Sequence, residues 1–236
     1  MLPRQSITEV LHFLDRRSLL VGASGCVTAA LFSLRKYIAK SPSIRWDELV
    51  DRVTQLASSP VNSSWNQEGY VSDIASLCQT LDIPASGLSQ QALNIELKLG
   101  HPAIQELARK ETFQMSLIVL EKDDVLPVHD HPRMTGVTLC LTGDVQLQSY
   151  SIVPDTHVSA GSCILQRKSN RVLSAGQVST LTMNTRNIHG LEAKSRCVLL
   201  DVFKPCPDPA RAKEARSYVL QAHQLSQEYV EATICC

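Results

Sequence analysis

The 236-residue chain has no excess of charge of either sign, since 23 Lys and Arg residues balance 23 Asp and Glu residues. Without a net charge there is no global field to draw the protein to nucleic acid, so we expect no nucleic-acid partner. The eight cysteines include no Cys-x-x-Cys pair and no framework of the kind found in small secreted domains. We therefore expect a reducing compartment, the cytoplasm or the nucleus. We also expect a monomeric protein.

A long hydrophobic run is also lacking. Residues 18–34 are uncharged and lie between two basic pairs, but they number 17 and include Gly, Ser and Thr. A helix that spans a membrane needs about 20 predominantly apolar residues. Three interpretations stay open: a buried helix with basic ends, a marginal membrane anchor, and a signal segment of twin-arginine type. Membrane association through this stretch is the alternative to a cytoplasmic location.

The first third of the chain has the periodicity of helices. Apolar residues recur there at steps of three and four, with a loop at 58–64 and a break at 84–87. We predict an N-terminal helical region over residues 1–90, which includes the apolar segment 18–34, and a second domain over residues 91–236. The periodic positions are Leu49, Val53, Leu56, Val71, Ile74, Leu77 and Leu81.

From about Glu111 onward, short β-type runs alternate with turn residues. Many short strands at roughly even spacing favour an antiparallel barrel or jelly roll over βαβ units. After the proline-rich segment 205–209, the apolar residues Ala212, Ala215, Val219 and Ala222 lie in helical register, which predicts a C-terminal helix. The predicted strand runs are 113–120, 137–141, 145–152, 162–166, 180–183 and 198–203.

Two histidines, His129 and His131, stand one residue apart in a segment that reads as a strand. Residues i and i+2 of a strand share one face, so both rings can reach a single metal ion. Asp130 then points to the opposite face, where a structural hydrogen bond is expected. His189, just before the apolar run 197–203, is in a comparable setting and is the predicted third ligand.

The spacing after His131 resembles the first signature of the cupin barrel, which is a double-stranded β-helix or jelly roll. That signature places a Glu and then a Gly after His-x-His, and here the same count reaches Gly136 and Gly143. The carboxylate ligand is absent. Three neutral imidazoles leave a divalent ion with its full charge and open positions, and a small Gly136 leaves room, so the predicted site suits an anionic ligand.

The wider pattern resembles the thiol dioxygenases of the cysteamine dioxygenase and plant cysteine oxidase type. His-Asp-His-Pro at 129–132 continues to Met134, Gly136, Gly143 and Tyr150; Asn-Ile-His follows at 187–189, and a Leu-Asp-Val strand at 198–205. The likeness covers about residues 105–220.

This resemblance implies that His129, His131 and His189 hold Fe(2+), and that O2 oxidises an amine thiol to the sulfinic acid. The thiol would be cysteamine or the N-terminal cysteine of a peptide or protein. In the latter case, oxidation of the cysteine would depend on the availability of oxygen and mark the protein for degradation (N-degron oxygen sensing). Asp201 is the expected catalytic contact to substrate or to a ligand histidine, because a carboxylate in an apolar strand needs a partner. Arg133 and Met134 are expected to bind substrate.

Three departures from the family pattern keep alternatives open. Arg133 and Arg186 stand where the family has glycine, and Pro205-Cys206-Pro207 stands where it has Pro-Pro-Tyr. A zinc ion on three histidines and a water is also a hydrolytic site. The alternative function is therefore an inactive or zinc-binding cupin that serves as a ligand-binding or membrane-anchored scaffold module.

Overall fold

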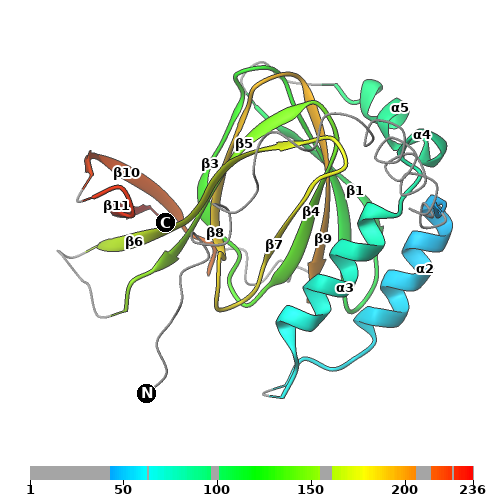
Figure 1. Ribbon diagram of the computed structural model, residues 1–236, viewed down its shortest axis with the longest axis horizontal. Helices are drawn as coiled ribbons and strands as arrows, with labels where there is room; N and C mark the ends of the chain where they lie inside the picture. Colours follow the sequence, from blue (N-terminus) through cyan, green and yellow to red (C-terminus); the bar gives the residue numbers. More distant parts are fainter. Residues whose placement is uncertain are drawn as a thin grey trace, which may run out of the picture. The chain divides into compact units, whose positions relative to one another are not determined.

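The fold was analysed in a computed structural model (Figure 1). In the part of the chain that the structure describes, no helix is long and apolar enough to cross a membrane. The apolar segment 18–34 lies outside this part, as does Cys206. The described residues are 43–62, 64–96, 101–154, 161–205, 214–224 and 226–235.

Helices occupy the N-terminal side of the described chain, as the periodicity predicts. The first, α2, buries Leu49, Val53 and Ala57 on one face. The side chain of Asn66 caps the next helix by accepting a hydrogen bond from the backbone N–H of Gly69 at 2.9 Å. The predicted break at 84–87 contains a short helix instead. The helices are α2 (Trp46–Ala57), α3 (Gln67–Gln79), α4 (Ile83–Ser86) and α5 (Leu88–Leu93).

The rest of the chain folds into two antiparallel sheets (Figure 1). The first has the order β1-β2-β9-β4-β7, and the second closes on itself in the order β10-β11-β6-β5-β8-β3. This confirms the predicted mainly β fold. The strands are β1 (Ala103–Arg109), β2 (Gln114–Leu120), β3 (Val125–Asp130), β4 (Thr135–Thr142), β5 (Asp144–Ile152), β6 (Ser162–Ser174), β7 (Val178–Leu181), β8 (Ile188–Ala193), β9 (Cys197–Lys204), β10 (Ser217–Gln224) and β11 (Tyr229–Cys235).

Strand β9 is buried on both faces, which explains its continuous apolar sequence. Val198, Leu200 and Val202 belong to the core cluster that includes the helices. Cys197 and Leu199 belong to a second cluster, with residues from the other sheet. Odd-numbered residues of β9 therefore face the interior between the two sheets.

The second sheet also has two distinct faces. Leu147 of β5 and Leu191 of β8 join the cluster between the sheets. Tyr150 and Ile188, on the opposite face of the same strands, pack with Tyr218 inside the curl of the second sheet. The candidate site, described below, lies in the interior between the two sheets.

The prediction of a C-terminal helix is wrong in the described residues that follow 205–209. Residues 217–224 form β10, which pairs with β11, and Ser217 pairs with His129 of β3. Tyr218 is buried while Val219 is 55% exposed, which is the period of a strand. The helical spacing of small apolar residues is outweighed here by the pairing that closes the second sheet. Residues 206–213, which include Ala212, lie outside the described residues.

Candidate metal centre

The three predicted ligand histidines come together from two neighbouring strands. His129 lies near the end of β3 and is the direct partner of His189 in the β3–β8 ladder. Partners in a ladder share one face of a sheet, so both side chains enter the same compartment. His131 follows one residue after β3 ends. The structure therefore brings the three predicted residues together.

The loop after β3 is held by Asn187, which lies two residues before His189. Its side-chain oxygen accepts a hydrogen bond from the backbone N–H of His131 at 2.9 Å. Its amide nitrogen donates to the backbone carbonyls of Met134 at 3.2 Å and Thr182 at 3.1 Å. Asn187 thus fixes the position of His131 relative to His189, a role that the Asn-Ile-His pattern alone does not reveal.

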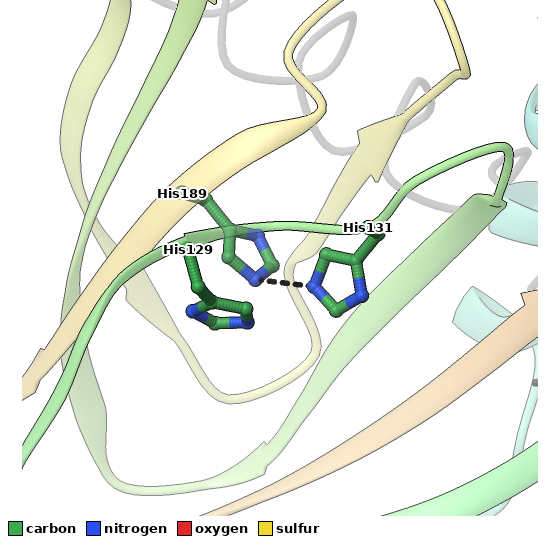
Figure 2. Close-up of side chains that lie close together, drawn as sticks. All are labelled: His129, His131 and His189. Atoms are coloured by element: carbon green, nitrogen blue, oxygen red, sulfur yellow. Dashed lines mark hydrogen bonds between the residues drawn. The ribbon is translucent and has the colours of Figure 1, made fainter. Parts of the chain in front are cut away.

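The three imidazole rings converge on one point, as Figure 2 shows. Their centroids are 4.7, 4.8 and 4.9 Å apart, and one ligand atom from each ring lies within 4.8 Å of the others. The Nε2 atoms of His131 and His189 are 3.1 Å apart. Two nitrogens that each lie about 2.0–2.1 Å from one metal ion are separated by about 3 Å, so the pair fits a shared ion.

A backbone contact sets the orientation of His129. Its Nδ1 lies 2.7 Å from the carbonyl oxygen of Pro127, which can only accept, so Nδ1 carries the proton. The Nε2 lone pair is then available to a metal. Hydrogen bonds of this kind accompany most metal-binding histidines in proteins.

The electrostatic environment keeps all three imidazoles neutral. Burial lowers the pKa of His129 and His131, and it lowers that of His189 to about 3. Neighbouring imidazoles lower the pKa of His131 and His189 further, since a second positive charge would be repelled. Neutral imidazole is the form that binds metal ions, so the donor set fits a metal cofactor.

Gly136 does not leave an open space, contrary to the expectation from its size. A Cβ atom at this position would lie 2.4 Å from Cδ1 of Phe203 and 2.9 Å from the carbonyl oxygen of Val202. The Phe203 ring stacks on His131, with centroids 4.5 Å apart and an interplanar angle of 20°. The aromatic ring therefore occupies the place where the cupin signature would put its glutamate.

Asp201 faces the same interior, two residues before Phe203 on β9. Its side chain is 6% exposed and accepts a hydrogen bond of 2.6 Å from the hydroxyl of Thr138. The prediction expected a contact to substrate or to a ligand histidine, and the partner in the structure is the hydroxyl of Thr138. Burial raises the pKa of Asp201 to about 7, with the Thr138 hydrogen bond acting in the opposite direction.

The two arginines that replace family glycines share a backbone feature. Arg133 has φ 60° and Arg186 has φ 56°, in the left-handed region that glycine adopts most easily. Both arginines thus occupy backbone positions that glycine would adopt with less strain. Nη2 of Arg186 lies 3.4 Å from Oε2 of Glu68 at the start of α3, and Nε of Arg133 lies 3.7 Å from Oε2 of Glu214.

Arg133 also lines a cavity of about 550 Å³ with Tyr150 and Ile188. The lining also includes Ser151 and Asn187, so the cavity lies where β5 ends and β8 begins. Met134 is half-buried, and its backbone N–H donates to the carbonyl of His131 at 3.0 Å. Arg133 and Met134 both belong to residues 131–134, which join β3 to β4 and are called the His131 loop below.

The start of helix α3 contacts both loops of the site. The side-chain oxygen of Gln67 accepts from the Thr135 hydroxyl at 3.0 Å and from the backbone N–H of Met183 at 2.8 Å. Thr135 follows the His131 loop, and Met183 precedes His189. Sequence analysis missed this residue because a single glutamine in a helix carries no local signal of a distant partner.

Comparison with known proteins supports the resemblance. The family model described as PCO_ADO matches residues 89–232. "Plant cysteine oxidase 2" of Arabidopsis thaliana is 30% identical over 102 residues, which are 42% of this chain and 37% of that protein. "Probable 2-aminoethanethiol dioxygenase" of Dictyostelium discoideum is 26% identical over 102 residues, covering 42% and 47%. The matches thus span less than half the length of these relatives.

Several solved structures are similar to part of this chain. TT1209 from Thermus thermophilus has a TM-score of 0.37 at 18% identity and covers 48% of this chain and 91% of its own. An RmlC-like cupin from Shewanella frigidimarina has a TM-score of 0.36 at 20% identity, with 48% and 83% covered. The match to the family model, which spans more than half of the sequence, shows that the chain belongs to the PCO_ADO family.

Proposed function

We propose that the protein is a non-haem iron thiol dioxygenase that oxidises an amine thiol to its sulfinic acid. The observation that carries the proposal is a metal centre of three neutral, converging imidazoles in which Phe203 fills the place of a carboxylate. Family membership supports the same chemistry, because the named relatives are a cysteine oxidase and an aminoethanethiol dioxygenase.

The proposed reaction is balanced without a further reductant, since RSH and O2 together give RSO2H. Fe(2+) held by His129, His131 and His189 would favour the thiolate form of a bound thiol and supply the electrons that activate O2. The hydrogen bond to the carbonyl of Pro127 leaves the Nε2 lone pair of His129 available to such an ion. Three neutral ligands would leave the charge of the ion to be neutralised by an incoming thiolate.

Asp201 is proposed to contact the substrate or a bound group inside the compartment. Its pKa of about 7 means that it can accept a hydrogen bond from a substrate amine or exchange a proton at neutral pH. Thr138 holds one carboxyl oxygen in place. Arg133 and Met134 are proposed to bind the substrate where the His131 loop borders the surface.

The substrate is proposed to be cysteamine or the N-terminal cysteine of a peptide or protein. Oxidation of an N-terminal cysteine would place a negative charge there and report the availability of oxygen.

We further propose a monomeric enzyme of the cytoplasm or nucleus. Its catalytic domain would span residues 91–236, after a helical region over residues 1–90, and the start of the family match at residue 89 supports this boundary.

The test combines metal analysis with oxygen uptake. Iron-loaded protein is mixed with cysteamine or with a Cys-initiated peptide, and the peptide mass is measured for a gain of two oxygen atoms. His189→Ala is expected to lose both iron and oxygen uptake, whereas His101→Ala, which removes an exposed histidine, should retain both. Absence of oxygen uptake with either thiol, despite bound iron, would contradict the proposal.

A further inference from the structure

Ser149 lies beside the metal centre, although no sequence pattern pointed to it. It is the direct partner of His189 in the β5–β8 ladder, so the two side chains emerge on the same face. Leu147 and Leu191, the next residues on that face, belong to the core between the two sheets. Ser149 therefore points into the compartment that the three histidines enter.

The hydroxyl group of Ser149 is buried without a partner. The residue is 3% exposed, and its Oγ atom makes no hydrogen bond in the structure. The large majority of buried side-chain polar atoms in proteins have a hydrogen-bond partner, and an unsatisfied one has a free-energy cost. Two other interior hydroxyls differ in this respect: Thr138 donates to Asp201, and Ser116 accepts from Gln114.

The length of the Ser149 side chain limits which bound group its hydroxyl can contact. Oγ lies one bond beyond Cβ in serine, whereas Nε2 lies three bonds beyond Cβ in histidine. Ser149 therefore ends beside the base of the His189 side chain, short of the point where the rings converge. It is placed to contact a group bound next to the ion rather than the ion itself.

We propose that Ser149 is a substrate-binding residue whose hydroxyl donates a hydrogen bond to the anionic sulfur of the bound thiol. This inference rests on the proposed function, because the thiolate is the ligand that completes the hydroxyl's hydrogen bonding. A hydrogen bond to a charged group is among the stronger ones in proteins. Its loss is expected to weaken thiol binding about tenfold or more.

The test measures thiol binding without turnover. Protein loaded with Co²⁺ is titrated with cysteamine in the absence of oxygen, and the thiolate-to-metal absorption band gives the dissociation constant. The variants are Ser149→Ala, Ser149→Thr and Ser89→Ala. Ser89 of α5 is the matched control because its Oγ atom is also buried and unpartnered.

We expect Ser149→Ala to bind Co²⁺ like the wild type and the thiol about tenfold more weakly. Ser149→Thr should recover most of the affinity, and Ser89→Ala should not change it. The melting temperature of metal-free Ser149→Ala should equal or exceed that of the wild type, since the variant removes an unsatisfied hydroxyl.

Equal thiol affinity of Ser149→Ala and wild type would overturn the inference and leave the proposed function intact. Loss of Co²⁺ binding in Ser149→Ala would also overturn it, because the hydroxyl would then support the metal site itself. Failure of the Co²⁺-loaded wild type to bind the thiol would overturn the proposed function and the inference together.

Discussion

The variant Asp201→Asn, studied in the metal-free protein, tests quantitatively how burial affects the carboxyl group of Asp201. Asparagine keeps the shape of the side chain and an acceptor for the Thr138 hydroxyl, and it removes the titration. The residues directly opposite Asp201 in its two neighbouring strands are Ser116 and Thr138, and neither is charged. The difference in unfolding free energy between wild type and variant therefore measures the effect of burying one carboxyl group.

The expected magnitude comes from the pKa of Asp201, which burial raises from 3.8 to about 7. The folded protein thus holds this proton more tightly than the unfolded chain does. Stability from Asp201 is fully present below pH 4 and falls as pH rises through 7. A difference of about 3 pKa units corresponds to about 4 kcal/mol, at 1.36 kcal/mol for each unit.

The assay is urea unfolding of both proteins at pH 5, 7 and 8.5. Relative to Asp201→Asn, the wild type should lose about 3 kcal/mol of unfolding free energy between pH 5 and pH 8.5, since the first part of the total of about 4 kcal/mol is lost below pH 5. Asp73→Asn, on the exposed face of α3, controls for the removal of one negative charge. Loading with a divalent ion should shrink the difference, because a nearby cation lowers the pKa of a carboxyl group.

An equal difference in unfolding free energy between wild type and Asp201→Asn at pH 5 and pH 8.5 would contradict the raised pKa of Asp201. Asp201 would then titrate as in the unfolded chain, which requires a charged partner or water. A difference that grows with pH, but equally in Asp73→Asn, would also refute it.

Further predictions concern the contacts around His131 and its loop. Gly136→Ala should destabilise the protein by about 1–3 kcal/mol and weaken metal binding, since its Cβ would displace the Phe203 ring; urea unfolding and metal titration measure this. Gln67→Ala should cost about 1–3 kcal/mol and speed hydrogen exchange in residues 182–187, as the Met183 N–H loses its acceptor. Arg133→Gly should stabilise the fold by about 1 kcal/mol in urea, by relieving a left-handed arginine, and unchanged stability would contradict this.

Local patterns in the sequence determined much of this protein. Alternation and apolar runs placed β2, β4, β5 and β9 close to their observed bounds, because a side chain's face in a strand follows from its own position. The same reasoning brought His129 and His131 together and indicated His189. The absence of a carboxylate at Gly136 was likewise visible in the spacing alone.

Contacts between distant segments decided the rest. The C-terminal strands replace a predicted helix because β10 joins β3 and β11, a pairing that local spacing does not encode. Phe203 meets His131, and Gln67 meets the loops of the site, only after the sheets and α3 have packed. Ser149 appears ordinary in the sequence, and its position beside His189 follows from the register of β5 against β8. The sequence by itself thus determined which histidines are the candidate ligands, whereas the tertiary structure decided that they meet and what surrounds them, because hydrogen-bond partners and burial depend on residues far apart in the chain.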